Sequence, residues 1–134
     1  MIWVIDTSAL IRLFVPDGPI HPDIEGAFNR AASGADVVLA PQLLLAETGN
    51  VLLRKFRRGE LSSQELTELL QAIASLPIRH CDHEPLLMPA CALAQSHNLT
   101  LYDALYLAVA EQHGARLLTN DNALGNVARA IGVA

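Results

Sequence analysis

The chain has 134 residues, of which 51% are hydrophobic, and it contains only two cysteines. This length and composition predict a single domain over residues 1–134 that buries its core without disulfide or metal staples. The formal net charge of −5 argues against a molecule that is basic overall, which is the usual electrostatic basis of nucleic-acid binding.

In the first half of the chain, short apolar runs alternate with helical patterns. Pro16, Gly18 and Pro19 form a breaker cluster, and Gly59 is a typical residue to close a helix. The predicted elements are a strand over Ile2–Ile5, a helix over Thr7–Phe14, a helix over Pro22–Ala32, a strand over Val37–Leu39 and a long helix that Pro41 opens and that carries Glu47.

The second half continues this alternation. Ser62 and Glu65 have the spacing of a capping box, and Gly114 closes the most apolar helix. The predicted elements are a helix from Ser62 to Ile73, an extended segment near Ile78, helices over Glu84–His97 and Tyr102–His113, a strand over Arg116–Thr119, a helix over Asp121–Ala130 and an edge strand over Ile131–Ala134. Short apolar strands between helices favour an α/β sandwich with a mainly parallel central sheet.

No segment is predicted to cross a membrane. The stretch Pro85–Tyr102 lacks Asp, Glu, Lys and Arg, but it contains two prolines and several polar residues. The sequence runs from Met1 directly into an apolar strand, without the basic region of a secretion signal. We therefore expect a cytoplasmic protein.

Four carboxylates adjoin apolar segments, where a charge is costly unless it is paired, neutralised or bound to a metal. Glu47, for example, has only Leu43 and Val51 one helical turn away. No Lys or Arg stands at the helical or strand spacing that would pair any of the four. They are Asp6, Glu47, Asp103 and Asp121.

The predicted elements bring these carboxylates to one edge of the sheet. Asp6 and Asp121 directly follow strands, and ligands of parallel sheets bind beyond the C-terminal ends of the strands. Glu47 and Asp103 are expected in the opening turns of helices, which face the same edge. We therefore predict that all four converge in one cleft.

Each carboxylate also has a simpler structural explanation. Asp6 and Asp121 could cap the helices that follow them. Thr100 and Asp103 have the spacing of a capping box. Glu47 has the weakest explanation of this kind, because a mid-helix Glu on an apolar face gains nothing from the helix dipole or from a neighbouring cation.

Clustered oxygen ligands select hard cations such as Mg²⁺ or Mn²⁺. A zinc site around His80, Cys81, His83 and Cys91 is an alternative, but the spacing is not that of a zinc finger. The chain has neither a glycine-rich phosphate loop nor a G-x-S-x-G nucleophile elbow. Metal-assisted phosphoryl chemistry is therefore favoured.

Four motifs together resemble the PIN-domain nucleases, and most closely the VapC-type toxins of toxin–antitoxin pairs. They cover nearly the whole chain in order: D-T-S-A-L from Asp6, the helical Glu47, Y-D-A-L-Y-L-A from Tyr102, and L-T-N-D ending at Asp121. The first and third motifs are specific in combination, whereas T-x-D alone is weak.

The resemblance implies a PIN-like three-layer sandwich with helices on both faces of the sheet, and an Mg²⁺- or Mn²⁺-dependent endoribonuclease. The implied catalytic and metal-binding residues are Asp6, Glu47, Asp103 and Asp121, and the implied supporting residues are Thr7, Ser8 and Thr119. Water activated by the metal would attack the RNA phosphodiester in line, leaving 5′-phosphate and 3′-hydroxyl ends.

The resemblance also implies three partners: an RNA substrate, a VapB-like antitoxin and a second copy of the chain in a homodimer. The basic segment, made of Arg54, Lys55, Arg57 and Arg58, is expected to contact RNA or the antitoxin, or to be a solvated helix end favoured by the dipole. Two alternatives stay open: an RNA-processing PIN nuclease without an antitoxin, and a non-catalytic RNA or protein adaptor. Carboxylates without cationic partners argue against the adaptor.

Overall fold

A computed structural model describes residues 1–134, with seven α-helices, one 3-10 helix and four strands. Their bounds, in chain order, are β1 (Ile2–Ile5), α1 (Thr7–Ile11), α2 (Ile24–Ala32), β2 (Val37–Pro41), α3 (Leu43–Arg57), α4 (Ser63–Ala74), β3 (Ile78–Cys81), η1 (Glu84–Leu86), α5 (Leu87–His97), α6 (Leu101–His113), β4 (Arg116–Leu118) and α7 (Asn122–Ala130). None of the helices is both long and apolar enough to span a membrane.

The strands form one fully parallel sheet in the order β3-β2-β1-β4. In its register, Trp3 of β1 lies opposite Val38 of β2, and Val4 lies opposite Leu117 of β4. The chain therefore moves from β1 outward to β3 and then returns to place β4 on the other side of β1. The C-terminal ends of β1 and β4 flank the point where the strand order reverses, which is the usual ligand position in such sheets.

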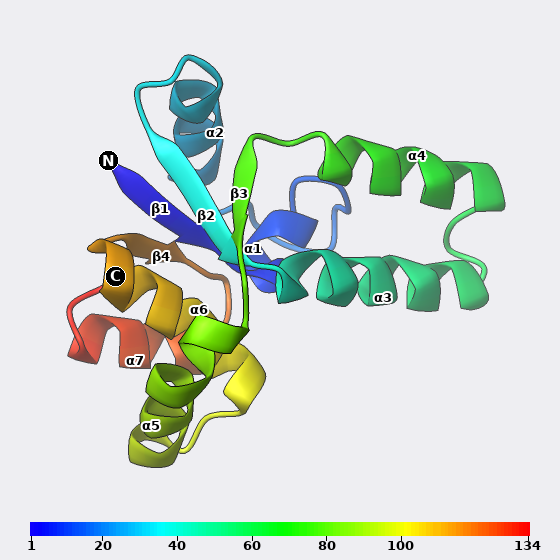
Figure 1. Cartoon of the computed structure of the whole chain (residues 1–134). Helices are drawn as coiled ribbons and strands as arrows, with labels where there is room; N and C mark the ends of the chain where they lie inside the picture. Colours follow the sequence, from blue (N-terminus) through cyan, green and yellow to red (C-terminus); the bar gives the residue numbers. More distant parts are fainter.

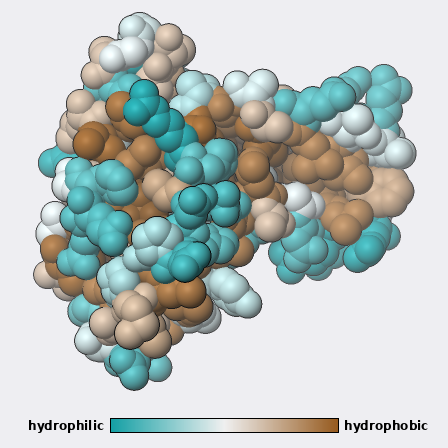
Figure 2. All heavy atoms as spheres, in the orientation of Figure 1, coloured by the Kyte–Doolittle hydropathy of each residue, from teal (hydrophilic) through white to brown (hydrophobic).

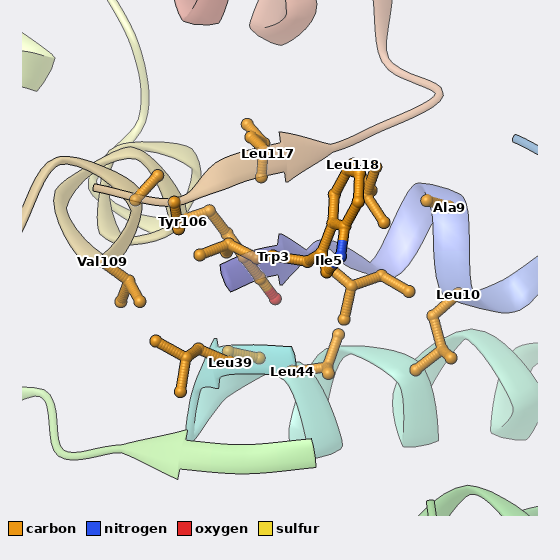
Figure 3. Packing of buried hydrophobic residues seen from close by; sticks show 14 of the residues in the cluster. Trp3, Ile5, Ala9, Leu10, Leu39, Leu44, Tyr106, Val109, Leu117 and Leu118 are labelled. Atoms are coloured by element: carbon orange, nitrogen blue, oxygen red, sulfur yellow. The ribbon is translucent and has the colours of Figure 1, made fainter. Parts of the chain in front are cut away.

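Helix α6 and the sheet share one hydrophobic core. α6 packs against β1, β2 and β4, and α5 packs against α6. All residues from Ala104 to Ala110 are buried, so α6 is apolar on every side, as its sequence indicates. Figure 3 shows Tyr106 and Val109 of this helix facing the side chains of β1 and Leu39 of β2. This packing fixes the helix that carries Asp103.

Helices lie on both sides of the sheet, and one helical pair extends away from it. In Figure 1, α2 and the α5–α6 pair lie on opposite sides of the strands, while α3 and α4 project to one side of the body. The capping box of Ser62 and Glu65 starts α4, with both reciprocal hydrogen bonds present. The predicted α/β sandwich with a parallel sheet is confirmed.

Three predicted boundaries are wrong for physical reasons. Pro41 ends β2 instead of opening α3, because a strand's last residue does not need its N–H in the ladder. α1 stops at Ile11, and the chain continues to Phe14 in turns with i→i−3 hydrogen bonds. Ile131–Ala134 forms no strand: Gly132, at φ 84°, turns the chain, and Val133 accepts a single hydrogen bond from Leu117.

Candidate active site

The four predicted carboxylates line one pocket of about 280 Å³. Asp6 follows β1, Glu47 lies in the second turn of α3, Asp103 lies in the first turn of α6, and Asp121 precedes α7. No Lys, Arg or His lines this pocket. The prediction that four residues distant in sequence converge in one cleft is therefore confirmed by the structure.

Asp6 is buried, with 5% of its surface exposed, and hydrogen bonds engage both of its carboxylate oxygens. Its Oδ1 accepts from the backbone N–H of Ala9 at 2.9 Å and from the Ser8 hydroxyl at 2.7 Å. Its Oδ2 accepts from the Thr119 hydroxyl. Asp6 thus caps α1, as the alternative explanation predicted, and its orientation is fixed at the same time.

Ser8 and Thr119 connect the ends of the two strands. The Ser8 hydroxyl accepts from the backbone N–H of Asn120 at 2.9 Å, and the Thr119 hydroxyl accepts from that of Asp121 at 3.0 Å. Each hydroxyl therefore donates to Asp6 and accepts from the β4–α7 loop. These contacts orient the Asp6 carboxylate, and the supporting role that the resemblance implies for both residues stays a prediction.

Glu47 is half-buried, and its Oε1 accepts two hydrogen bonds from hydroxyl groups. Tyr106 donates at 2.6 Å and Thr7 donates at 3.3 Å. Tyr106 is a site residue that the sequence reasoning missed. The available signal was its position three residues after Asp103, on the same face of α6.

Asp103 and Asp121 differ in how their carboxylates are held. Thr100 caps α6 by accepting from the Asp103 backbone N–H at 3.1 Å, but the Asp103 carboxylate does not complete a capping box and accepts no hydrogen bond. Asp121 does cap α7, because its Oδ1 accepts from the N–H of Leu124 at 2.9 Å. This cap occupies only one of its two carboxylate oxygens.

Burial and mutual repulsion make the anionic forms of two carboxylates costly. Burial raises the pKa of Asp6 to about 6, although hydrogen bonds from Thr119, Ala9 and Ser8 oppose the shift. Burial, followed by the charges of Asp121 and Glu47, raises the pKa of Asp103. Burial and the hydrogen bond to Glu47 also raise the pKa of Tyr106, which keeps its hydroxyl protonated and donating. A bound cation would favour the anionic forms of Asp6 and Asp103 and would therefore oppose the rise in both pKa values.

The donor set of the pocket fits a hard cation. It offers carboxylate oxygens without a competing Lys or Arg, and the Asp103 carboxylate has no partner of any kind. Such oxygens suit Mg²⁺ or Mn²⁺. In the structure, no three His, Cys, Asp or Glu side chains stand close enough together to hold a metal ion as they are. To bind a cation, the carboxylates would have to move closer together, and their attraction to the positive charge favours that movement.

The zinc alternative has no support in the structure. The Nε2 of His83 accepts from the backbone N–H of Leu43 at 3.0 Å, and this contact ties the histidine to the start of α3. Cys91 is exposed on α5, while Cys81 lies in β3. The histidine therefore serves the backbone of a neighbouring helix.

The basic segment lies at the C-terminal end of α3, where cations complement the helix dipole. The ammonium of Lys55 contacts the carboxylates of Asp17 and Glu60. Arg54, Arg57 and Arg58 are exposed at the same end. The four members thus differ in how free they are to contact another molecule.

Comparisons with known proteins agree with this fold. The PIN domain family model matches residues 3–130, and the chain therefore belongs to the PIN-domain family. Within that family its relatives include VapC-type ribonucleases. It is 33% identical to Ribonuclease VapC3 of Pyrobaculum aerophilum, covering 90% of both chains. It is 31% identical to Ribonuclease VapC1 of Mycobacterium tuberculosis, covering 90% of this chain and 86% of the relative.

Two solved structures share the architecture. PAE2754 from Pyrobaculum aerophilum has a TM-score of 0.67 at 26% identity, covering 91% of this chain and 76% of that one. VapC20 of Mycobacterium tuberculosis, a sarcin-ricin loop cleaving toxin, has a TM-score of 0.65 at 21% identity, covering 95% of each chain. The second likeness shows the fold alone.

Proposed function

We propose that this protein is an Mg²⁺- or Mn²⁺-dependent endoribonuclease that acts as the toxin of a toxin–antitoxin pair. The observation that carries the proposal is the pocket in which Asp6, Glu47, Asp103 and Asp121 meet without a cationic side chain. The ribonuclease names of relatives at 33% and 31% identity support RNA as the substrate. A cytoplasmic location is the matching expectation for a protein that cuts cellular RNA.

In this proposal the four carboxylates bind the cation, and hydrogen bonds orient two of them, Asp6 and Glu47, before it arrives. Ser8, Thr119 and the N–H of Ala9 orient Asp6, while Tyr106 and Thr7 orient Glu47. Supports of this kind reduce the reorganisation that binding requires. Asp103 contributes a carboxylate that no donor competes for, and Asp121 contributes the oxygen that its cap leaves free.

A bound divalent cation supplies Lewis acidity towards a phosphoryl oxygen and lowers the pKa of water. The hydroxyl groups of Ser8, Thr7 and Tyr106 all donate to carboxylates, and Tyr106 stays protonated because its pKa is raised. We therefore assign these groups to positioning and assign the attack on phosphorus to water. The four carboxylates repel the negative charge of the substrate phosphate. The phosphate can therefore enter the pocket only when a cation is bound there.

Cleavage of labelled RNA tests this function. The wild-type protein should cut RNA in millimolar Mg²⁺ and leave it intact in EDTA, and Asp6→Asn should be inactive in both. The Asn side chain is similar in size and can still cap α1, so a melting curve close to that of the wild type would separate lost chemistry from lost fold. Equal cleavage in EDTA, or by Asp6→Asn, would refute the metal mechanism.

The antitoxin is the partner that separates a toxin from an RNA-processing nuclease. Figure 2 shows apolar surface on the projecting α3–α4 pair, where Phe56 and Leu70 are exposed. A small protein that covers this surface and reaches the acidic pocket with an Arg would silence the enzyme. Expression of the chain alone should arrest growth of a host cell, and a small protein encoded next to it should restore growth. Normal growth with active protein would favour RNA processing.

A homodimer is the second assembly in the proposal. The α5–α6 pair exposes four large apolar side chains: Leu87, Met88, Leu101 and Tyr102. Met88 is 81% exposed, which is unusual for a methionine on a helix that packs against the body. Light scattering should give twice the 14.4 kDa mass of the chain. Met88→Glu should shift the equilibrium towards the monomer.

A further inference from the structure

A second pocket, rich in cations, adjoins the acidic pocket. It has a volume of about 240 Å³ and shares Ile11 and Val51 with its neighbour. The side chains that complete its lining are Arg12, Asp17, Arg54, Lys55 and Arg58. Four cations and one carboxylate therefore lie directly beside four carboxylates.

Not all of these cations are free. Lys55 contacts both Asp17 and Glu60, so its charge and that of Asp17 are internally compensated. Arg12, Arg54 and Arg58 form no salt bridge. Three guanidinium groups in the pocket are thus not engaged in a salt bridge, although the charge of Arg12 helps to lower the pKa of Asp17.

Arg12 is held in place by packing alone. Its Nε is buried and makes no hydrogen bond. A Cβ atom placed on Gly18 would lie 3.0 Å from this Nε, so the Pro16–Pro19 loop closes directly over the guanidinium. The buried Nε cannot be reached from the pocket. The two terminal nitrogens of the guanidinium are not among the buried atoms, so these are the donors that an anion in the pocket would meet.

The geometry of α3 aligns the other two arginines with the acidic pocket. At 3.6 residues per turn, Arg54 and Arg58 lie within about 20° of the direction of Glu47, whereas Arg57 lies about 80° away. Along the helix axis, Arg54 is about 10 Å and Arg58 about 16 Å from Glu47. The acidic and cationic groups therefore follow one line along one face of the helix, and Arg57 stands outside it.

The negative charge of RNA is the reason that cations are needed beside the acidic pocket. RNA phosphates are repelled by four carboxylates, and the whole chain carries a net charge of −5, so long-range attraction does not bring RNA to the pocket. Local cations must compensate. Guanidinium groups match phosphate oxygens with paired N–H donors, and they keep their charge at every physiological pH.

We propose that Arg12, Arg54 and Arg58 form a subsite for an RNA phosphate that flanks the phosphate held at the acidic pocket. The subsite rests on the proposed ribonuclease function and specifies how the substrate is positioned. It assigns different roles to members of the basic segment: Arg54 and Arg58 bind RNA, Lys55 secures the loop through Asp17, and Arg57 makes no contact with the substrate. Arg12, at the C-cap of α1, completes the subsite.

Three single substitutions with the same net charge test the subsite. Arg54→Ala and Arg58→Ala should each raise KM for a short RNA about tenfold with kcat unchanged, because the lost contact is made equally in the ground and transition states. Arg57→Ala removes the same charge from the same helix end and should leave KM unchanged. The slope of log KM against log salt should flatten by about 0.7 in the first two variants and stay constant in the third.

A binding measurement separates this subsite from catalysis. In the inactive Asp6→Asn background, fluorescence anisotropy with the same RNA should show the same order of affinities, with Arg54→Ala and Arg58→Ala weaker than Arg57→Ala. Arg12→Lys, which keeps the charge and loses the planar fork, should weaken RNA binding while the melting temperature stays close to that of the parent.

The outcomes distinguish the two proposals. If the wild-type protein neither cleaves nor binds RNA, the ribonuclease function fails and the subsite fails with it. If it cleaves RNA and the three alanine variants have equal KM and equal salt slopes, the function stands and the subsite is overturned. The subsite is also overturned if Arg54→Ala and Arg58→Ala weaken only the binding of an acidic protein partner.

Discussion

The hydroxyl of Tyr106 donates a hydrogen bond of 2.6 Å to Oε1 of Glu47, joining two residues 59 positions apart. The contact links α6 to α3 across the pocket and gives the half-buried glutamate its stronger partner. Because Tyr106 is itself 1% exposed and packed in the core, the stable part of the fold determines the orientation of Glu47.

Tyr106→Phe tests this relationship. The substitution keeps the ring that fills the core and removes only the donor, so Glu47 retains the weaker bond from Thr7. We expect RNA cleavage, or the apparent affinity for Mg²⁺, to fall about 10- to 100-fold, measured by cleavage rates over a magnesium titration. Tyr102→Phe, at an exposed position of the same helix, is the matched control. Unchanged rates in Tyr106→Phe would assign the tyrosine to the core alone.

Thr119→Val should destabilise the fold as well as the site. Valine is close to threonine in shape, but it leaves Oδ2 of the buried Asp6 without a donor and the N–H of Asp121 without an acceptor. We expect the free energy of unfolding in metal-free buffer to fall by about 1–3 kcal/mol, measured by urea denaturation. Thr67→Val, at an exposed position of α4, should change it by less than half as much. Equal losses in both variants would contradict the proposed network.

Two substitutions of Asp121 separate its cap from its charge. Asn retains an oxygen that can accept from Leu124, whereas Ala removes both the cap and the charge. Asp121→Asn should therefore lower cleavage while leaving the melting temperature unchanged, and Asp121→Ala should also cost about 1 kcal/mol of stability. Thermal denaturation and cleavage assays on both variants measure these effects. Full activity in Asp121→Asn would mean that this residue only caps α7.

Acid stability should depend on Asp36, which lies outside the pocket. This buried carboxylate accepts hydrogen bonds from the Trp3 indole at 3.0 Å and from Arg30 at 2.6 Å. These bonds lower its pKa, so the folded state favours the anion. The resulting stability is present above the unfolded pKa of about 3.9 and is lost as the pH falls towards the lower folded value.

Asp36→Asn should accordingly melt at a lower temperature than the wild type at pH 7, and the gap should narrow as the pH falls below about 4. Melting curves between about pH 2 and about pH 7 measure the gap on both sides of the unfolded pKa. Asp23→Asn is the control, because Asp23 is exposed and its side chain makes no capping hydrogen bond to α2. A gap that stays constant over this range would contradict the shifted pKa.

Sequence reasoning identified the four carboxylates because each one adjoins an apolar segment, and segments of this kind are strongly constrained by burial. Asp6 and Asp121 follow strands whose apolar runs are evident in the sequence. Their position at the C-terminal edge of the sheet could therefore be predicted. The strand order could not, because the position of β4 beside β1 depends on long-range packing of α6. The signal for Tyr106, its spacing of three residues from Asp103, was weak because Tyr106 lies in a helix that is apolar on every side.

The ends of elements were predicted less well than their existence. Pro41 signals a helix start in isolation, but its missing N–H is equally acceptable in the last position of a strand. The roles within the basic segment were also out of reach from sequence. Only the structure shows that Lys55 turns to Asp17 and Glu60, while Arg54 and Arg58 face the pocket that Arg12 completes.

The central claim is that the four carboxylates bind a divalent cation, and Mn²⁺ binding followed by electron paramagnetic resonance tests it without RNA. Titration of the wild-type protein should remove the signal of free Mn²⁺ until the site is filled, and Asp6→Asn, Glu47→Gln and Asp103→Asn should each weaken that uptake. If the wild-type protein leaves the free Mn²⁺ signal unchanged, or if the three variants take up the ion as well as it does, the pocket is not a metal site.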